Sequence, residues 1–180
     1  MISEKLKLDE IDKQIITLVQ EDPNLTHTQI AEQINRSQPT VGMRIKKLEK
    51  SGILQFQPGI NFKRVDDVYL ATVEVNTKNP DELMDMARCC PFMLNAFRVS
   101  GDHNVCILLA SSKINKLDNI VNYHFRQNPD VHDVSMEVII DIAKDFILPI
   151  DFSSDEHNPT LEDGCGDQCR YRLAKKRGEI

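Results

Sequence analysis

The side chains with the clearest chemical capacity lie between residues 36 and 50, where amide, hydroxyl and basic groups recur at helical spacing. Gln38, Thr40 and Arg44 carry groups that can bond the edges of nucleic-acid bases, and amide and guanidinium groups can do so in a bidentate manner. The other polar side chains here suit the phosphate backbone, which positions a protein without specifying sequence; they are Arg36, Ser37, Lys46, Lys47 and Lys50. These residues predict an interface with double-stranded DNA.

The local charge supports this prediction. Residues 36–64 contain seven basic residues and one acidic residue, whereas the whole chain has a net charge of −6. Any small helical domain has one basic solvent-exposed face, but a positive patch on an acidic protein favours phosphate neutralisation. Residues 65–152 contain seven basic and fourteen acidic residues, so this part of the chain should repel DNA.

Three amphipathic segments with short connections position the basic residues. The first carries apolar residues at helical spacing and ends at Pro23; the second has Thr26 or Thr28 as its candidate N-cap. Ser37 is suited to cap the third, with Pro39 in its first turn and Gly52 just past its end. Such a tri-helical unit is typical of a (winged) helix-turn-helix DNA-binding domain.

The central part of the chain predicts an α+β fold. Alternating apolar residues indicate strands at 68–75, 92–100, 105–110 and 134–142, and helical spacing indicates helices at 80–90 and 113–127. This βαββαβ order is that of the ferredoxin-like fold, in which two helices cover one face of a four-stranded antiparallel sheet. The other face must be covered as well, so we expect dimerisation through it.

The predicted organisation therefore has four parts. Residues 1–55 form the helix-turn-helix domain, 56–66 a linker, 67–152 the βαββαβ domain, and 153–180 a C-terminal tail with a cysteine pair. No apolar run has the length of a membrane span, and residues 1–10 lack the apolar core of a signal peptide. With five cysteines and no secretory signal, we expect a cytoplasmic protein whose thiols are reduced.

This order of motifs resembles the Lrp/AsnC family of "feast/famine" transcription regulators. The resemblance is carried by LDEIDKQIITLVQEDPNLTHTQIAEQINRSQPTVGMRIKKLEKSGIL and VSGDHNVCILL, and it covers roughly residues 8–150. It implies a regulator that is not an enzyme and needs no cofactor. It also implies a dimer through the βαββαβ domain, often assembled into a tetramer or octamer, and a small effector, usually an amino acid, bound between these domains.

The resemblance places the effector near the loop of the central hairpin. The residues that it assigns are Gly101, Asp102, His103, Asn104, Ser135 and Met136. The family tends to have Gly-x-x-Asp in the loop and small hydroxyl residues on the final strand, whereas this chain has Asn104 and Met136. Both departures favour a different ligand or none, and a plain turn is an equal alternative for the loop.

The C-terminal tail suggests a second hypothesis for the function of the protein. Cys165 and Cys169 are four residues apart, and two thiolates at this spacing suit a soft metal ion, with His157 as a further candidate ligand. The chain would then be a metal- or redox-responsive regulator. A disordered tail whose bases contact DNA is the alternative, and Cys89, Cys90 and Cys106 are more typical of small core residues.

The sequence is compatible with two further hypotheses for the function. Sirohaem decarboxylases resemble these regulators, and an enzyme of that kind would need histidine and arginine side chains around a deep pocket. The available residues form no recognisable spacing: His103, His124, His132, Arg88 and Arg98. A nucleoid-packing protein without effector control differs from a regulator only in its sequence preference.

Overall fold

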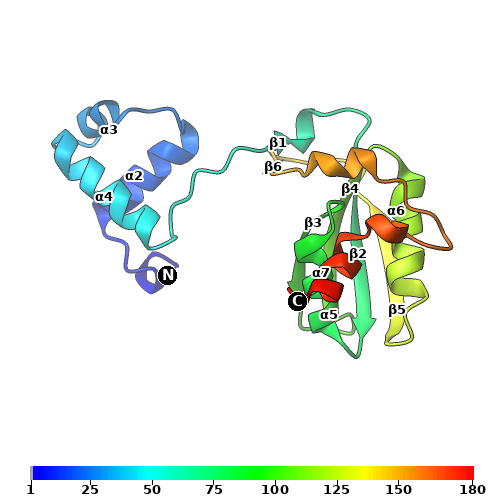
Figure 1. Ribbon diagram of the computed structural model, residues 1–180. Coiled ribbons are helices and arrows are strands. Elements are labelled where there is room, and N and C mark those ends of the chain that lie inside the picture. The colour runs from blue at the N-terminus through cyan, green and yellow to red at the C-terminus, as the bar shows by residue number, and fades with distance from the viewer. Residues whose placement is uncertain (1) are drawn as a thin grey trace. The chain divides into compact units, whose positions relative to one another are not determined.

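A computed structural model describes residues 2–180, which divide into two compact units at residues 57 and 58 (Figure 1). The N-terminal unit consists of helices α1 (Ile2–Lys5), α2 (Glu10–Glu21), α3 (His27–Gln33) and α4 (Gln38–Lys50). Its core is formed by buried residues of α2, α3 and α4, including Ile15, Ile30 and Val41, each fully shielded from solvent. Residues 51–57 after α4 form a turn and extended chain.

Side-chain caps fix where these helices begin. Asp9, Thr26 and Ser37 each accept a hydrogen bond from the backbone N–H three residues further on, which satisfies a donor that the first helical turn leaves free. Asp9 and Thr26 complete capping boxes, in which the third helical residue bonds back to the cap. The structure thus selects Thr26 over Thr28 as the cap of α3, and Gly52 follows α4 with a φ of 72°.

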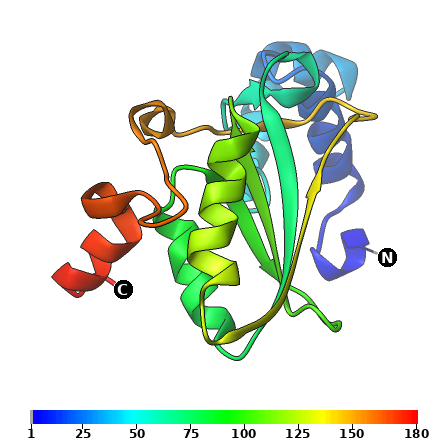
Figure 2. The same ribbon diagram turned by 90° about the vertical axis from the view of Figure 1, so that its right-hand side faces the viewer.

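The C-terminal unit contains the predicted ferredoxin-like module. Its four-stranded sheet consists of β2 (Tyr69–Thr77), β3 (Met93–Arg98), β4 (Val105–Ser111) and β5 (Val131–Val138). The strand order is β3-β4-β2-β5, and all neighbouring pairs are antiparallel. Helices α5 (Pro80–Cys89) and α6 (Ile114–Val121) complete the βαββαβ order, and a π-helical turn, Asn122–Arg126, continues α6 (Figure 2). The α+β fold class is confirmed.

Alternation along the strands separates the two faces of the sheet. Val73, Val75 and Ile107 are fully buried and pack with Leu83 of α5 and Leu117 of α6, so both helices cover the same face. On the opposite face, hereafter the open face, strand partners include Glu74 with Cys106 and Ser135, and Phe97 with Cys106. Phe97 is 48% exposed there, an unusual position for a large apolar ring.

The segment expected as a linker is partly structured. β1 (Ile60–Asn61) pairs with β6 (Ile147–Leu148), and Phe62 begins a short 3-10 helix that ends at Arg64. Phe62 is 6% exposed and packs with Leu70 and Ala110. The last strand of the main sheet ends at Val138 rather than at residue 142, because Ile139 and Ile142 pack in the cluster around Phe62 instead of extending the sheet.

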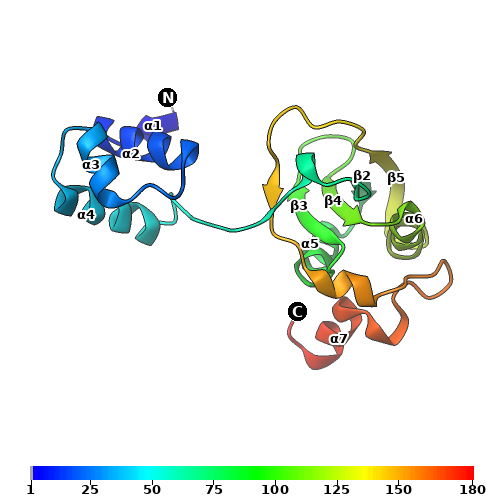
Figure 3. The ribbon, with the colours of Figure 1, turned by 90° about the horizontal axis from the view of Figure 1, so that it is seen from above.

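The C-terminal residues also pack on this unit. A 3-10 helix, Phe152–Glu156, is followed by the short turn Gly166–Gln168 and by α7 (Arg170–Arg177), which lies beside α5 (Figure 3). Tyr171 of α7 is buried, and its hydroxyl donates to Glu82 Oε1 at 2.9 Å. The tail is therefore ordered against the helical side of the module, in contrast to the disordered alternative. Across residues 2–180, no helix is long and apolar enough to cross a membrane.

Candidate nucleic-acid interface and effector region

Helix α4 presents most of the predicted DNA-contacting side chains to solvent. Gln38, Lys46, Lys47 and Lys50 are exposed, as are Arg36 and Ser37 just before the helix, and Thr40 is half-buried. The opposite side of α4 buries Val41, Ile45 and Leu48 in the core of the unit. The hydroxyl groups of Ser37 and Thr40 lie 2.8 Å apart at the start of the helix, so Ser37 also fixes where α4 begins.

Arg44, which is predicted to contact base edges, forms ion pairs within its own unit. Its guanidinium pairs with Asp9 and Asp12 of the α2 N-terminus, and the distance from Nη1 to Asp12 Oδ1 is 2.9 Å. The side chain of Arg44 is only 26% exposed, and that of Asp12 only 6%. The Arg44 guanidinium holds the pKa of Asp9 below its usual range. Arg44 therefore ties α4 to α2 instead of extending toward solvent.

Two residues that sequence analysis did not select, His27 and Met43, line a groove of about 400 Å³ with Gln38, Gly42 and Lys46. Met43 is 66% exposed on α4, in the middle of the basic face. In the sequence, Met43 could have been recognised as an apolar residue at a position where helical spacing predicts an exposed, polar side chain. A Cβ atom added to Gly42 would lie 3.2 Å from His27 Nδ1, so the glycine permits close packing of α3 on α4. An exposed apolar side chain in such a place suits a thymine methyl group.

Hydrogen bonds to the end of β2 fix the position of the hairpin loop that is predicted to bind an effector. Asn104 accepts from Thr77 N–H at 3.1 Å and donates through Nδ2 to Thr77 O at 2.7 Å. The backbone carbonyl of Asp102 accepts from Asn76 Nδ2 at 2.7 Å. These three hydrogen bonds join the loop to the end of β2. Asn104 thus uses both ends of its amide on the backbone, a role that a carboxylate at this position cannot fill.

The other predicted effector residues lie on two sides of the sheet. His103 Nε2 is 2.9 Å from Asp133 Oδ2, and His103 Nδ1 is 3.6 Å from Glu74 Oε2. Ser135 is the strand partner of Glu74 and shares the open face with it. Met136 packs against the hydrophobic core between the sheet and the helices. The structure therefore brings the loop and Ser135 to one face and directs Met136 away from them.

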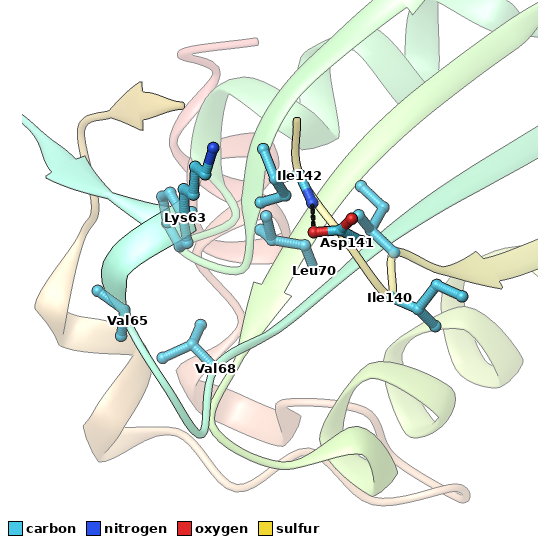
Figure 4. Close-up of a pocket in the computed structure, with 9 residues that line it drawn as sticks. Lys63, Val65, Val68, Leu70, Ile140, Asp141 and Ile142 are labelled. Atoms are coloured by element: carbon cyan, nitrogen blue, oxygen red, sulfur yellow. Dashed lines mark hydrogen bonds between the residues drawn. The ribbon is translucent and has the colours of Figure 1, made fainter. Parts of the chain in front are cut away.

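A second hollow lies at the other end of the module. It has a volume of about 190 Å³ and is lined mainly by aliphatic side chains, among them Val68, Leu70 and Ile142 (Figure 4). Its two charged side chains are engaged with the backbone: Lys63 Nζ donates to Ala143 O at 2.6 Å, and Asp141 Oδ1 accepts from Ile142 N–H at 2.8 Å. None of the predicted effector residues lines this hollow.

The tail cysteines are accompanied by a third thiol. Burial raises the pKa of Cys90 to about 12, and the nearby thiols of Cys165 and Cys169 add to this rise. Burial likewise raises the pKa of Cys165 to about 11. His157 Nδ1 lies 2.7 Å from Ser153 O and His157 Nε2 3.2 Å from Gln168 O, so this side chain contacts carbonyl groups. In the described chain, no three or more His, Cys, Asp or Glu side chains are arranged to hold a metal ion.

Residues 8–55 match a family described as winged helix-turn-helix DNA-binding. The transcriptional regulator LrpA of Pyrococcus horikoshii is 27% identical over 128 residues, which span 63% of this chain and 90% of LrpA. The resemblance to Lrp/AsnC regulators is confirmed.

Solved structures support the Lrp/AsnC fold over most of the chain. AsnC of E. coli superposes with a TM-score of 0.62 at 15% identity, covering 76% of this chain and 95% of AsnC. A transcriptional regulator of Neisseria meningitidis in complex with L-Met superposes with a TM-score of 0.68 at 22% identity, covering 79% of this chain and 96% of that protein. Residues beyond the βαββαβ core, including α7, lie past the part of the chain that the family resemblance covers.

Proposed function

We propose that this protein is a sequence-specific transcription regulator that reads DNA through α4. The observation that carries this proposal is the exposed face of α4, where an amide, an apolar side chain and three lysines (Gln38, Met43, Lys46, Lys47 and Lys50) point away from the core. In a helix-turn-helix unit, this face enters the major groove. Gln38 and Met43 are suited to base edges, and the lysines to phosphates.

The regulator acts as a dimer or a higher even oligomer. The open face of the sheet supports this part of the proposal, because Phe97 and the half-buried residues around it have no covering element within their own unit. Two helix-turn-helix units related by a two-fold axis require two half-sites in the DNA, so the operator should be roughly palindromic. Two linked helix-turn-helix units also bind such an operator more tightly than one unit alone.

A small effector shifts the equilibrium between the oligomeric arrangements of the regulator. His103, Asp133 and Glu74 form a polar group on the open face beside the hairpin loop, where a ligand between two modules would meet them. A ligand that binds one oligomeric arrangement better than another shifts the population toward it. The relatives named as transcriptional regulators favour this function over the sirohaem-decarboxylase alternative.

The test is selection of bound fragments from a random DNA library at low and at physiological salt, with and without a mixture of amino acids. We expect one palindromic motif to be enriched, and sedimentation to show a dimer or a multiple of it. Phe97→Glu is the matched variant for assembly: it should fold but dissociate, and lose affinity for the full operator while still binding a half-site. Binding without any motif, lost steeply as salt rises, would instead identify a packing protein. Absence of binding at both salt concentrations would refute the proposal.

A further inference from the structure

One histidine of the N-terminal unit lies against α4 at the position where that helix has no side chain. His27 is the first residue of α3 and is half-buried. A Cβ atom added to Gly42 of α4 would lie 3.2 Å from His27 Nδ1 and 3.6 Å from His27 Cε1, so the imidazole rests on the backbone of α4 at Gly42. Residues four apart lie on the same side of a helix, which places Gln38 and Lys46 one turn to either side of Gly42. His27 therefore fills the place between them on the face that is proposed to contact DNA.

Both nitrogen atoms of this imidazole are available to a ligand. The groove of about 400 Å³ on α4 is lined by His27, Gln38, Pro39, Gly42, Met43 and Lys46. In the part of the chain that the structure describes, the histidine rings that form hydrogen bonds or pair with acids are those of His103 and His157. A polar group that is partly removed from water gains from a hydrogen-bond partner, and a ligand in the groove would supply one to His27.

The charged side chains around His27 come from α4 and from α3 itself. Lys46 shares the groove with His27 and opposes a positive imidazole, whereas Glu49 lines the adjoining hollow with both residues and favours it. The residues that α2 and the neighbouring loops contribute to this hollow are all apolar. Glu32 is the other charged residue of α3, and it follows His27 by five positions, on a different side of the helix. A phosphate in the groove would add the negative charge that stabilises a protonated imidazole.

We propose that His27 binds a phosphate of the DNA backbone through a protonated imidazole, so that affinity for DNA rises as the pH falls from 8 to 6. This inference rests on the proposed function and extends the DNA-contacting surface from α4 to α3. In a helix-turn-helix unit, the helix that precedes the recognition helix crosses the DNA backbone, and α3 precedes α4. Histidine changes charge between pH 5 and 8, and the imidazole takes up its proton from solvent when the phosphate binds.

The test measures the affinity of the full chain for its selected operator and for random DNA at pH 8 and pH 6, each at several salt concentrations. We expect the wild type to bind both DNAs about 10-fold more tightly at pH 6, as for a hydrogen bond between charged groups. The salt dependence should also steepen, by about one counterion for each helix-turn-helix unit.

Two variants assign the effect to one histidine. His27→Gln should match the wild type at pH 8, which shows that it is folded, and should gain neither affinity nor salt dependence at pH 6. His132→Gln replaces an exposed histidine of β5 and should behave as the wild type does. The salt dependence of the wild type is a second readout that needs no variant.

Three results would overturn the inference and leave the proposed function standing. They are wild-type affinity that does not change between pH 8 and pH 6, an equal pH dependence in His27→Gln, and a pH effect on the operator alone, which would make His27 a base contact. Failure to bind DNA at either pH would refute the proposed function and this inference with it.

Discussion

Arg44 of α4 forms an ion pair with Asp12 of α2, with 2.9 Å between Nη1 and Oδ1. Asp12 is almost fully buried and also closes the capping box at Asp9, so this pair fixes the position of the DNA-reading helix against the first helix of its core. Arg44 thus acts through the fold of the unit, whereas Lys47, three residues further on, is exposed to solvent.

Arg44→Met should lower the free energy of unfolding of the N-terminal unit. Removing the guanidinium leaves the buried Asp12 carboxylate without its partner, at a cost of about 1–3 kcal/mol. The matched variant Lys47→Met should leave the stability unchanged and reduce the salt dependence of DNA binding by about one counterion. Urea unfolding and binding titrations at several salt concentrations measure both. Equal stability of the two variants would show that the ion pair does not support the helix.

Gln38→Ala and Lys46→Ala should affect DNA binding in different ways. Gln38 offers an amide to base edges, so its loss should cost about 1–3 kcal/mol on the selected operator and relax the preference at one position. Lys46 offers only charge, so its loss should weaken binding to operator and random DNA alike. Competition binding with the two DNAs separates these effects. If both variants lost affinity equally on both DNAs, Gln38 would be a phosphate contact.

Asn104→Asp should destabilise the C-terminal unit even though the change is nearly isosteric. The amide both donates to and accepts from the backbone of Thr77, and a carboxylate would face the Thr77 carbonyl without a proton to donate. We expect a loss of about 1–3 kcal/mol in thermal or urea unfolding. Asp102→Asn, in the same exposed loop, is the control, since only the backbone carbonyl of Asp102 bonds to Asn76. A fully stable Asn104→Asp would show that the hydrogen bond from Asn104 Nδ2 to Thr77 O does not stabilise the unit.

His124 should make the C-terminal unit sensitive to acid. Burial lowers the pKa of His124 from 6.5 to about 4, so the unfolded chain takes up this proton at a higher pH than the folded chain. Stability is therefore present above pH 6.5 and is lost as the pH falls toward 4. Between pH 7 and pH 5 the loss is about 2 kcal/mol by linkage.

The check is urea unfolding at both pH values, monitored by a probe in the C-terminal unit. His124→Gln carries no titrating group at this position and should lose about 2 kcal/mol less than the wild type over the same interval. If the two proteins showed the same pH dependence, protonation of His124 would not be linked to unfolding.

Local sequence patterns were sufficient to predict the helices of residues 8–54, the βαββαβ order and the exposed face of α4. Apolar spacing in 8–54 and alternation in 68–138 are local patterns, and caps such as Asp9, Thr26 and Ser37 act over three residues, so they can be read without tertiary contacts. The same patterns predicted that Gln38 and Lys46 are exposed while Val41 is buried.

Only the tertiary structure decided which polar groups are already engaged. Arg44 and Asp12 are 32 residues apart in the chain, and Asn104 and Thr77 are 27 apart, so no local pattern links them. The contact of the buried Lys116 Nζ with the His157 carbonyl likewise joins residues that are 41 apart in the chain. Long-range pairing of polar groups depends on how whole helices and strands pack against one another. Local sequence patterns therefore do not reveal these pairs.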